Sequence, residues 1–182
     1  MIDLRKDKLP SWVECDGRLY KLQTSFRIWI EFERRLREDG LVWAGVFEAD
    51  VPESDNWVEG VLEFFKSPNA TPKEKREADT ARAIDLVLDG EMIVAAFQQA
   101  YGIDLTSEDM HWHRFKALLR CLPDDTMLRE IAGYRTYRKP PKGGKDAHDA
   151  QMREKREEWT LPDPAREAQV EELQEWANEF FN

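Results

Sequence analysis

Apolar residues near the start of the chain follow first a strand pattern and then a helix pattern. Residues 12–22, WVECDGRLYKL, place Asp16-Gly17, a favoured two-residue turn, between two short runs of strand-forming residues. The next stretch, TSFRIWIEFERRLRED, can be capped by Thr24 or Ser25 and ended by Gly40. Its apolar surface is broad and comprises Phe26, Trp29, Ile30, Phe32 and Leu36. We therefore predict a β-hairpin followed by a helix embedded between other elements.

Four further segments of the chain show helical spacing. ESDNWVEGVLEFFKS, residues 53–67, repeats apolar residues at Trp57, Val61, Leu62 and Phe65. DGEMIVAAFQQAYG begins at a possible cap, Asp89, and ends at Gly102. Residues 107–122 follow a cap at Thr106, with Asp109 at the acidic position of a capping box and Pro123 closing the helix. DDTMLREIAGYR supplies one more helix.

Composition changes after Arg138, where KPPKGGKDAHD is typical of a flexible connector. Beyond it, the sequence is charged and helical in character. We predict a mainly α protein: a helical body with a short N-terminal β-hairpin over residues 1–138, a flexible linker over 139–150, and a charged amphipathic helical tail over 151–182.

The tail carries an apolar stripe at spacings of three and four. Its members are Val170, Leu173, Trp176, Ala177 and Phe180, with acidic residues on the other side. Such a helix beyond a connector either folds back on the body or docks on a partner, including a second copy. Both alternatives remain open at the level of sequence, and the acidic polar face argues against membrane binding.

Charge and composition narrow the classes of function. The chain has 182 residues, 41% of them hydrophobic, 35% charged, and a formal net charge of −10. An acidic protein is repelled by phosphate backbones, so a general nucleic-acid binder is not expected. Two cysteines without metal-site spacing, no secretory leader and no apolar run of membrane length indicate a cytoplasmic protein.

The chemistry that the sequence suggests most directly is His111-Trp112-His113. In a helix over 107–122, His111 falls near the apolar side and His113 roughly opposite, so the two imidazoles should not share a metal ion. We expect a partly buried, hydrogen-bonded His111 and a solvent-exposed His113. Asp124-Asp125 fits a helix N-terminus better than an acid–base pair. The basic, aromatic YRTYRKPPKGGK fits a linker better than a single-strand binder. We therefore expect no metal, no cofactor and no catalytic residue.

Two stretches of the sequence also resemble a known protein family. Residues 95–137, AAFQQAYGIDLTSEDMHWHRFKALLRCLPDDTMLREIAGYRTY, resemble a bacteriophage family known by gene product number fifteen, and GRLYKLQTSFRIWIEFE is also similar. The similarity spans about residues 10–138. The residues that carry it are Phe97, the run Tyr101, Gly102, Ile103, Asp104 and Leu105, then Trp112, Phe115, Leu118, Leu122, Pro123, Gly133, Tyr134 and Arg135. Among them we expect Phe97, Tyr101, Gly102, Trp112, Phe115, Leu118, Pro123, Tyr134 and Arg135 to lie in the core.

The resemblance implies a tail assembly chaperone of long-tailed phages and prophages. Such a protein binds the tape measure protein, helps to recruit tail tube subunits in the host cytoplasm, and is absent from the mature virion. It is not an enzyme; the alternative is a structural tail or connector component retained in the virion. Under this hypothesis the candidate partner-binding residues are Val170, Leu173, Trp176 and Phe180 of the tail, with Trp29 and Phe32 of the first helix. For the last two we favour core packing.

Overall fold

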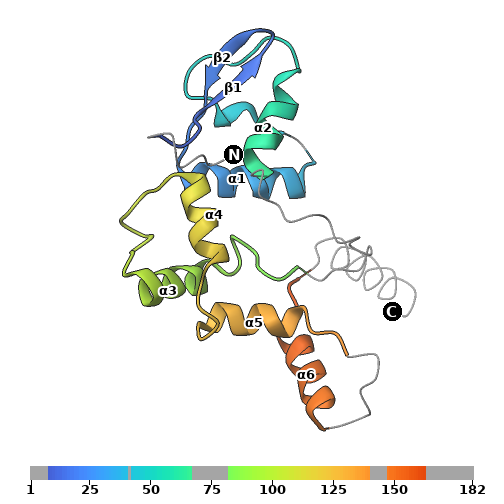
Figure 1. The fold of residues 1–182 in the computed structure, drawn as a ribbon. Coiled ribbons are helices and arrows are strands. Elements are labelled where there is room, and N and C mark those ends of the chain that lie inside the picture. Colours follow the sequence, from blue (N-terminus) through green and yellow to red (C-terminus); the bar gives the residue numbers. More distant parts are fainter. Residues whose placement is uncertain (1–7, 41, 67–81, 140–146, 163–182) are drawn as a thin grey trace, which may run out of the picture. The chain divides into compact units, whose positions relative to one another are not determined.

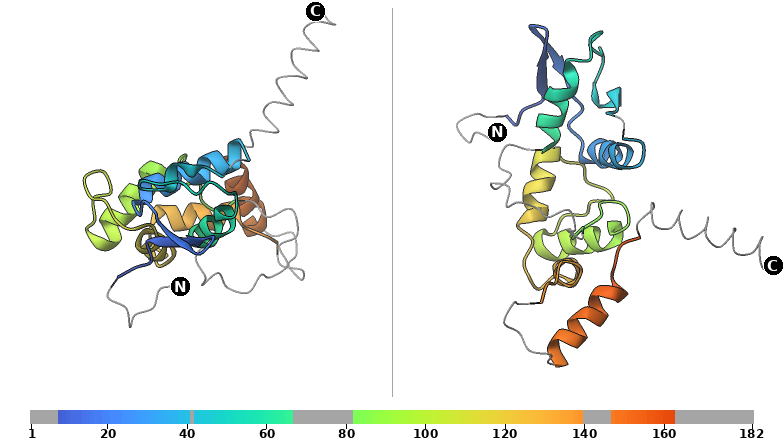
Figure 2. Two further views of the ribbon diagram at one scale, coloured as in Figure 1. Left: turned by 90° about the horizontal axis from the view of Figure 1, so that it is seen from above. Right: turned by 90° about the vertical axis from the view of Figure 1, so that its right-hand side faces the viewer.

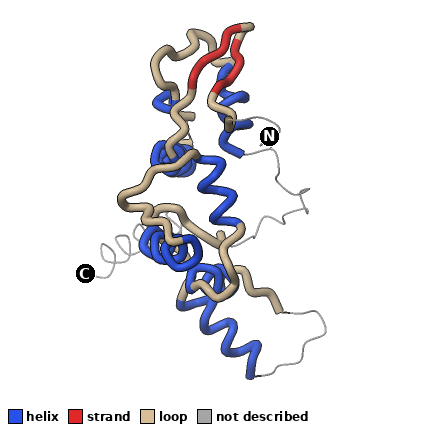
Figure 3. The backbone as a smooth tube through the Cα atoms, turned by 60° about the vertical axis from the view of Figure 1, so that its left-hand side comes forward, coloured by secondary structure: helices blue, strands red, loops and turns tan. Residues whose placement is uncertain are grey.

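A computed structural model describes residues 8–40, 42–66, 82–139 and 147–162 (Figure 1). Its elements in chain order are β1 (Trp12–Cys15), β2 (Arg18–Lys21), α1 (Phe26–Glu38), the 3₁₀ turn η1 (Ala44–Val46), α2 (Trp57–Lys66), α3 (Gly90–Tyr101), α4 (Trp112–Arg120), α5 (Met127–Arg135) and α6 (Ala147–Glu158). Figure 3 shows the described strands confined to one hairpin, while helices dominate the rest of the described chain. The predicted mainly α fold with a short N-terminal hairpin is confirmed.

The chain divides into two compact units. The first comprises residues 1–79 and 86–129, and the second comprises residues 80–85 and 130–182. The division falls within α5, between Arg129 and Glu130. Each unit is described by itself below.

The hairpin of the first unit turns at the predicted dipeptide. Asp16 and Gly17 have φ angles of 50° and 74°, the left-handed values that a tight primed turn requires and that glycine adopts without strain. The Asp16 carboxylate accepts hydrogen bonds from the Ser54 hydroxyl and, at 2.8 Å, from the Asn56 amide. The turn is thereby tied to the loop that leads into α2, and these bonds lower the pKa of Asp16.

The embedded helix predicted after the hairpin is α1. Ser25 is its N-cap, and the Ser25 hydroxyl accepts a hydrogen bond from the Arg27 amide at 3.3 Å. Trp29 and Phe32 are fully buried, and the Trp29 indole N–H donates to the Gln23 carbonyl at 2.7 Å. The core of this unit is aromatic: the ring centroids are 4.8 Å apart for Phe26 and Phe115, 4.7 Å for Trp29 and Phe64, and 5.6 Å for Phe65 and Trp112.

α4 begins later than the sequence predicted. The predicted cap, Thr106, is wrong, because its backbone amide and hydroxyl both donate to the Asp104 carboxylate and form a separate turn. The helix starts at Trp112, and His111 is its N-cap. The preceding residues are held extended by two backbone bonds from the start of α1, Phe26 N–H to the Met110 carbonyl at 3.0 Å and Trp112 N–H to the Thr24 carbonyl at 2.7 Å.

The predicted capping-box role of Asp109 is also wrong, because α4 starts three residues after it, at Trp112. Its carboxylate accepts from the Ser25 hydroxyl at 2.8 Å and lies 3.2 Å from the Arg27 guanidinium. Asp89 occupies the N-cap position of α3 as predicted, but its side chain makes no capping hydrogen bond. Gly102 ends α3 in the left-handed conformation, with φ 68°, as its position predicted.

In the second unit, a buried arginine and a buried aspartate organise the described residues. The Arg135 guanidinium donates to the carbonyls of Trp159 at 2.7 Å and Ala83 at 3.2 Å. Asp149, on α6, accepts from Arg153 at 2.6 Å.

α6 begins at Ala147 and so includes the last four residues of the expected linker. Residues 140–146 of that linker, and Val170, Leu173, Trp176 and Phe180 of the tail, lie outside the described residues.

Candidate partner-binding surface

One face of α2 is fixed against the hairpin and the aromatic core. Trp57, Val61 and Phe64 are buried on this inner face, and α2 packs on β1 (Figures 1 and 2). At Gly60 a Cβ would lie 3.5 Å from the Val13 Cβ, an ordinary van der Waals distance, so α2 lies directly against β1 at this point. The orientation of the remaining, outer face of α2 is therefore set by packing.

The C-terminal end of α2 is held by polar groups of α4. The Phe64 carbonyl lies 2.9 Å from His113 Nε2, and the Phe65 carbonyl accepts from the Trp112 indole at 3.2 Å and from the Lys116 ammonium. Donors at this position satisfy carbonyls that a helix end leaves unpaired. Burial lowers the pKa of His113 to about 4, and burial with the nearby charge of Arg120 lowers the pKa of Lys116 to about 7.

The expected solvent exposure of His113 is wrong, because its side chain is only 2% exposed. The Phe64 carbonyl can only accept, so His113 Nε2 carries the proton, and Nδ1 is buried without a hydrogen-bond partner among the described residues. This is the arrangement of a neutral imidazole in a core.

The expected partial burial and hydrogen bonding of His111 are confirmed. His111 Nδ1 accepts from the His113 amide at 3.1 Å, and Nε2 lies 2.9 Å from the Pro10 carbonyl, so this imidazole is also neutral. Because His111 precedes the helix, the rings of His111 and His113 lie on the same side, with centroids 5.1 Å apart. The opposite placement inferred from helical rotation is therefore wrong. Within the described ranges, no group of three or more His, Cys, Asp or Glu residues could hold a metal ion.

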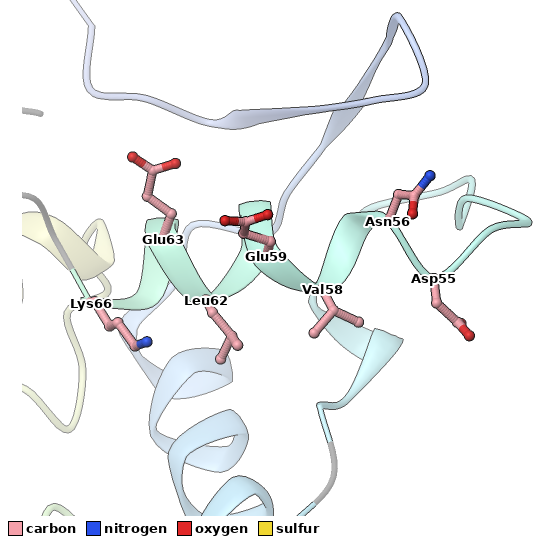
Figure 4. Close-up of a pocket in the computed structure, with 7 residues that line it drawn as sticks. All are labelled: Asp55, Asn56, Val58, Glu59, Leu62, Glu63 and Lys66. Carbon is pink, nitrogen blue, oxygen red and sulfur yellow. The ribbon is translucent and has the colours of Figure 1, made fainter.

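The outer face of α2 borders an open hollow of about 720 Å³. We define the α2 outer face by the residues that line this hollow, which are Asp55, Asn56, Val58, Glu59, Leu62, Glu63 and Lys66 (Figure 4). Figure 4 shows Glu59 and Glu63 projecting to one side of the helix, with Val58, Leu62 and Lys66 on the other. Val58 and Leu62 are one helical turn apart and half-buried, so this face joins an apolar strip to a row of carboxylates.

The charges of the α2 outer face differ from those of α1. On α1, Glu31 lies 2.8 Å from Arg34 and 2.6 Å from Arg35, and Glu33 lies 3.4 Å from Arg37. Asp55, Glu59 and Glu63 form no ion pair with any described residue. Their negative charge is left for solvent or for a partner.

The outer side of the hairpin is a second exposed surface of the first unit. Trp12 is 52% exposed and Leu19 is 67% exposed. Trp12 faces Lys21 and Leu19 faces Glu14 in the antiparallel register, so the two apolar side chains lie diagonally on one face. Its charged members have opposite signs, and this face carries less net charge than the α2 outer face.

The structure places the other sequence-predicted residues mainly in the interior. Trp29 and Phe32 are fully buried and are therefore absent from both exposed surfaces. Among the family-motif residues, Phe97, Trp112, Phe115 and Arg135 are buried, Leu118 and Tyr134 are half-buried, and Pro123 is exposed. Tyr101 donates to the Leu118 carbonyl at 2.9 Å, and Gly102 supplies the left-handed end of α3.

Sequence reasoning missed the α2 outer face. It grouped Leu62 with Trp57 and Val61 as one apolar side, whereas the buried set is Trp57, Val61 and Phe64. The available signal was a second apolar pair, Val58 and Leu62, at helical spacing and next to Glu59 and Glu63. Which pair faces the core depends on the hairpin and on α4, which lie elsewhere in the sequence.

These features define a mainly α protein of two compact units whose first unit presents an acidic helix face with an apolar strip. No helix among the described residues has the length and apolar character to cross a membrane. The family model described as Bacteriophage Gp15 protein matches residues 5–161, and the chain belongs to this family. The match extends past the expected limit near residue 138 and includes α6. Comparison with curated proteins and with solved structures gave no match.

Proposed function

We propose that this protein is a phage tail assembly chaperone that binds the tape measure protein and helps to recruit tail tube subunits. Membership of the bacteriophage family over residues 5–161 carries this proposal. In this proposal the protein acts without catalysis, in the cytoplasm of the bacterial host, and is not retained in the mature virion.

The first unit has physical features that such a chaperone requires. A long helical client exposes apolar stripes that aggregate if they stay uncovered. A chaperone for it needs a helix face with some apolar area, to bind, and unpaired charge, to keep the complex dissolved. The α2 outer face combines Val58 and Leu62 with three carboxylates that have no ion-pair partner among the described residues.

Co-expression tests the proposal. The chain and the tape measure protein of the same genome are produced separately and together, and the soluble material is analysed by light scattering on a sizing column. We expect the tape measure protein to be soluble only on co-expression, in a complex with many copies of the chain per client, because weak repeated contacts act by avidity.

If the client remains insoluble and nothing co-elutes, the chaperone proposal fails. Quantifying the chain in purified particles then decides the alternative. A stoichiometric amount in the virion indicates a structural tail or connector component, which the chaperone proposal does not allow.

A further inference from the structure

The α2 outer face has the size of a short helix-docking site. α2 spans ten residues, which corresponds to about 15 Å of helix, or about three turns. A helix laid along it would place apolar residues three and four apart against Val58 and Leu62. Because packing against β1 and α4 fixes the inner face of α2, the outer face is formed before any partner arrives.

The charge of the face specifies the flanks of a bound helix. Asp55, Glu59 and Glu63 outnumber the single Lys66, and none of these four residues has an ion-pair partner among the described residues. A helix with lysine or arginine on both sides of its apolar stripe would meet these carboxylates, while an acidic helix would be repelled.

Three segments of this chain outside the described residues, and a second copy docked face to face, do not meet this requirement. Residues 163–182 carry six Asp or Glu residues against one arginine, so the acidic tail would be repelled from the face. Residues 67–81 balance three basic against three acidic residues and contain no large apolar residue to cover Val58 and Leu62. Residues 1–7 also balance two basic with two acidic side chains, and a second copy docked face to face would oppose carboxylate with carboxylate.

We propose that the α2 outer face docks an amphipathic helix of a partner protein, with an apolar stripe flanked by lysine and arginine. This inference rests on the proposed function for the identity of the partner: the helix is then a basic segment of the tape measure protein. The docking mode itself depends only on the geometry and charge of α2.

A designed peptide probe tests the docking mode. The probe is a fluorescein-labelled helical peptide of about four turns with a leucine stripe flanked by lysines, and its counterpart carries glutamates in place of the lysines. Binding to the full-length chain is followed by fluorescence anisotropy. We expect the lysine peptide to bind and the glutamate peptide to show no binding.

Charge reversal locates the contact. The variant Glu59→Lys with Glu63→Lys reverses two carboxylates one turn apart on α2, and we expect at least about a tenfold weaker Kd, which corresponds to about 1.4 kcal/mol. The matched control is Glu154→Lys with Glu158→Lys, an exposed pair at the same spacing on α6. Both variants change the net charge by the same amount. If the contact is local, the Kd of the control should stay within about twofold of the original Kd. A long-range charge effect would instead weaken binding in both variants. Thermal unfolding of each variant verifies that the fold is retained.

Three results overturn the inference: equal weakening by both double variants, equal binding of both peptides, or no binding of the lysine peptide to the unaltered chain. The co-expression assay separates this inference from the proposed function. A complex with the tape measure protein that survives Glu59→Lys with Glu63→Lys refutes docking at α2 and leaves the chaperone proposal standing. Absence of any complex with the unaltered chain counts against the chaperone proposal, while the peptide measurements still decide whether the α2 outer face binds a basic helix.

Discussion

Burial of His113 makes the stability of the first unit depend on pH. Its imidazole is neutral in the folded protein, where burial lowers the pKa from 6.5 to about 4. Below pH 6.5 the unfolded chain takes up a proton that the folded chain does not bind. The stabilisation from the neutral imidazole is therefore complete above pH 6.5 and is lost as the pH falls toward 4.

The size of the effect follows from this difference in pKa. Between the two pKa values, each fall of one pH unit lowers the free energy of unfolding by about 1.4 kcal/mol. A fall from about pH 7.5 to about pH 5 should thus remove about 2 kcal/mol through His113. Lys116, with its pKa lowered to about 7, and His111, with its pKa lowered by burial, add to the total, but a variant at position 113 retains both of these groups.

The variant His113→Gln isolates the contribution of this residue. A glutamine amide can still donate to the Phe64 carbonyl, and it does not titrate. We expect the loss of stability from about pH 7.5 to about pH 5 to be smaller by about 2 kcal/mol in the variant. Urea unfolding followed by tryptophan fluorescence measures it, since five of the seven tryptophans lie in the first unit.

His148→Gln is the matched control, because His148 is an exposed histidine on α6 in the second unit. This control should keep the pH dependence of the unaltered protein. If His113→Gln loses as much stability as the unaltered protein over the same interval, His113 is not held neutral in the folded state and the reasoning fails.

Three further substitutions test the packing. Trp29→Phe should lower the free energy of unfolding by about 2 kcal/mol in urea denaturation, because it opens a cavity and removes the donor to the Gln23 carbonyl; Trp12→Phe, at a half-exposed site, should change it by less than about 0.5 kcal/mol, and equal losses would contradict the assigned burial. Gly17→Ala should cost about 1 kcal/mol in the same assay, since φ at this position is 74°, and a neutral result would place the turn elsewhere. Arg135→Met should cost the second unit about 2 kcal/mol by leaving the Trp159 and Ala83 carbonyls without this donor, and hydrogen exchange of the α6 amides should accelerate; unchanged exchange would refute it.

Features of the fold that depend on a few neighbouring residues could be predicted from the sequence. The Asp16-Gly17 turn, the Ser25 cap and the Gly102 helix end each follow from residues within one turn of the site. The start of α4 could not be predicted in this way, because two signals compete there. Asp104 binds the hydroxyl and the amide of Thr106, and backbone bonds from the start of α1 hold residues 110–112 extended. The second signal comes from a segment more than 80 residues away, so the helical spacing of apolar residues near α4 does not reveal it.

The candidate site could not be predicted for the same reason, because burial there depends on residues that are distant in the sequence. His113 is buried by a contact with Phe64, 49 residues earlier in the chain, so its polar character alone suggested solvent. Likewise, both apolar pairs of α2 have helical spacing, and only the packing on β1 shows that the Val58 and Leu62 side is the outer one.

The polar contacts of α4 with the end of α2 and the α2 outer face are consequences of one arrangement. The donors of α4 fix the last carbonyls of α2, and the aromatic rings of Phe64 and Phe65 fix its inner side against Trp29 and Trp112. A helix held at its end and along its inner side has little conformational entropy left to lose when a partner docks on its outer side. Weak, reversible contacts through two half-buried aliphatic side chains and three carboxylates can then suffice for binding, provided that they are repeated along one client. Under the proposed function, a chaperone that releases its client after assembly needs affinity of this kind, built from many weak contacts on a rigid face.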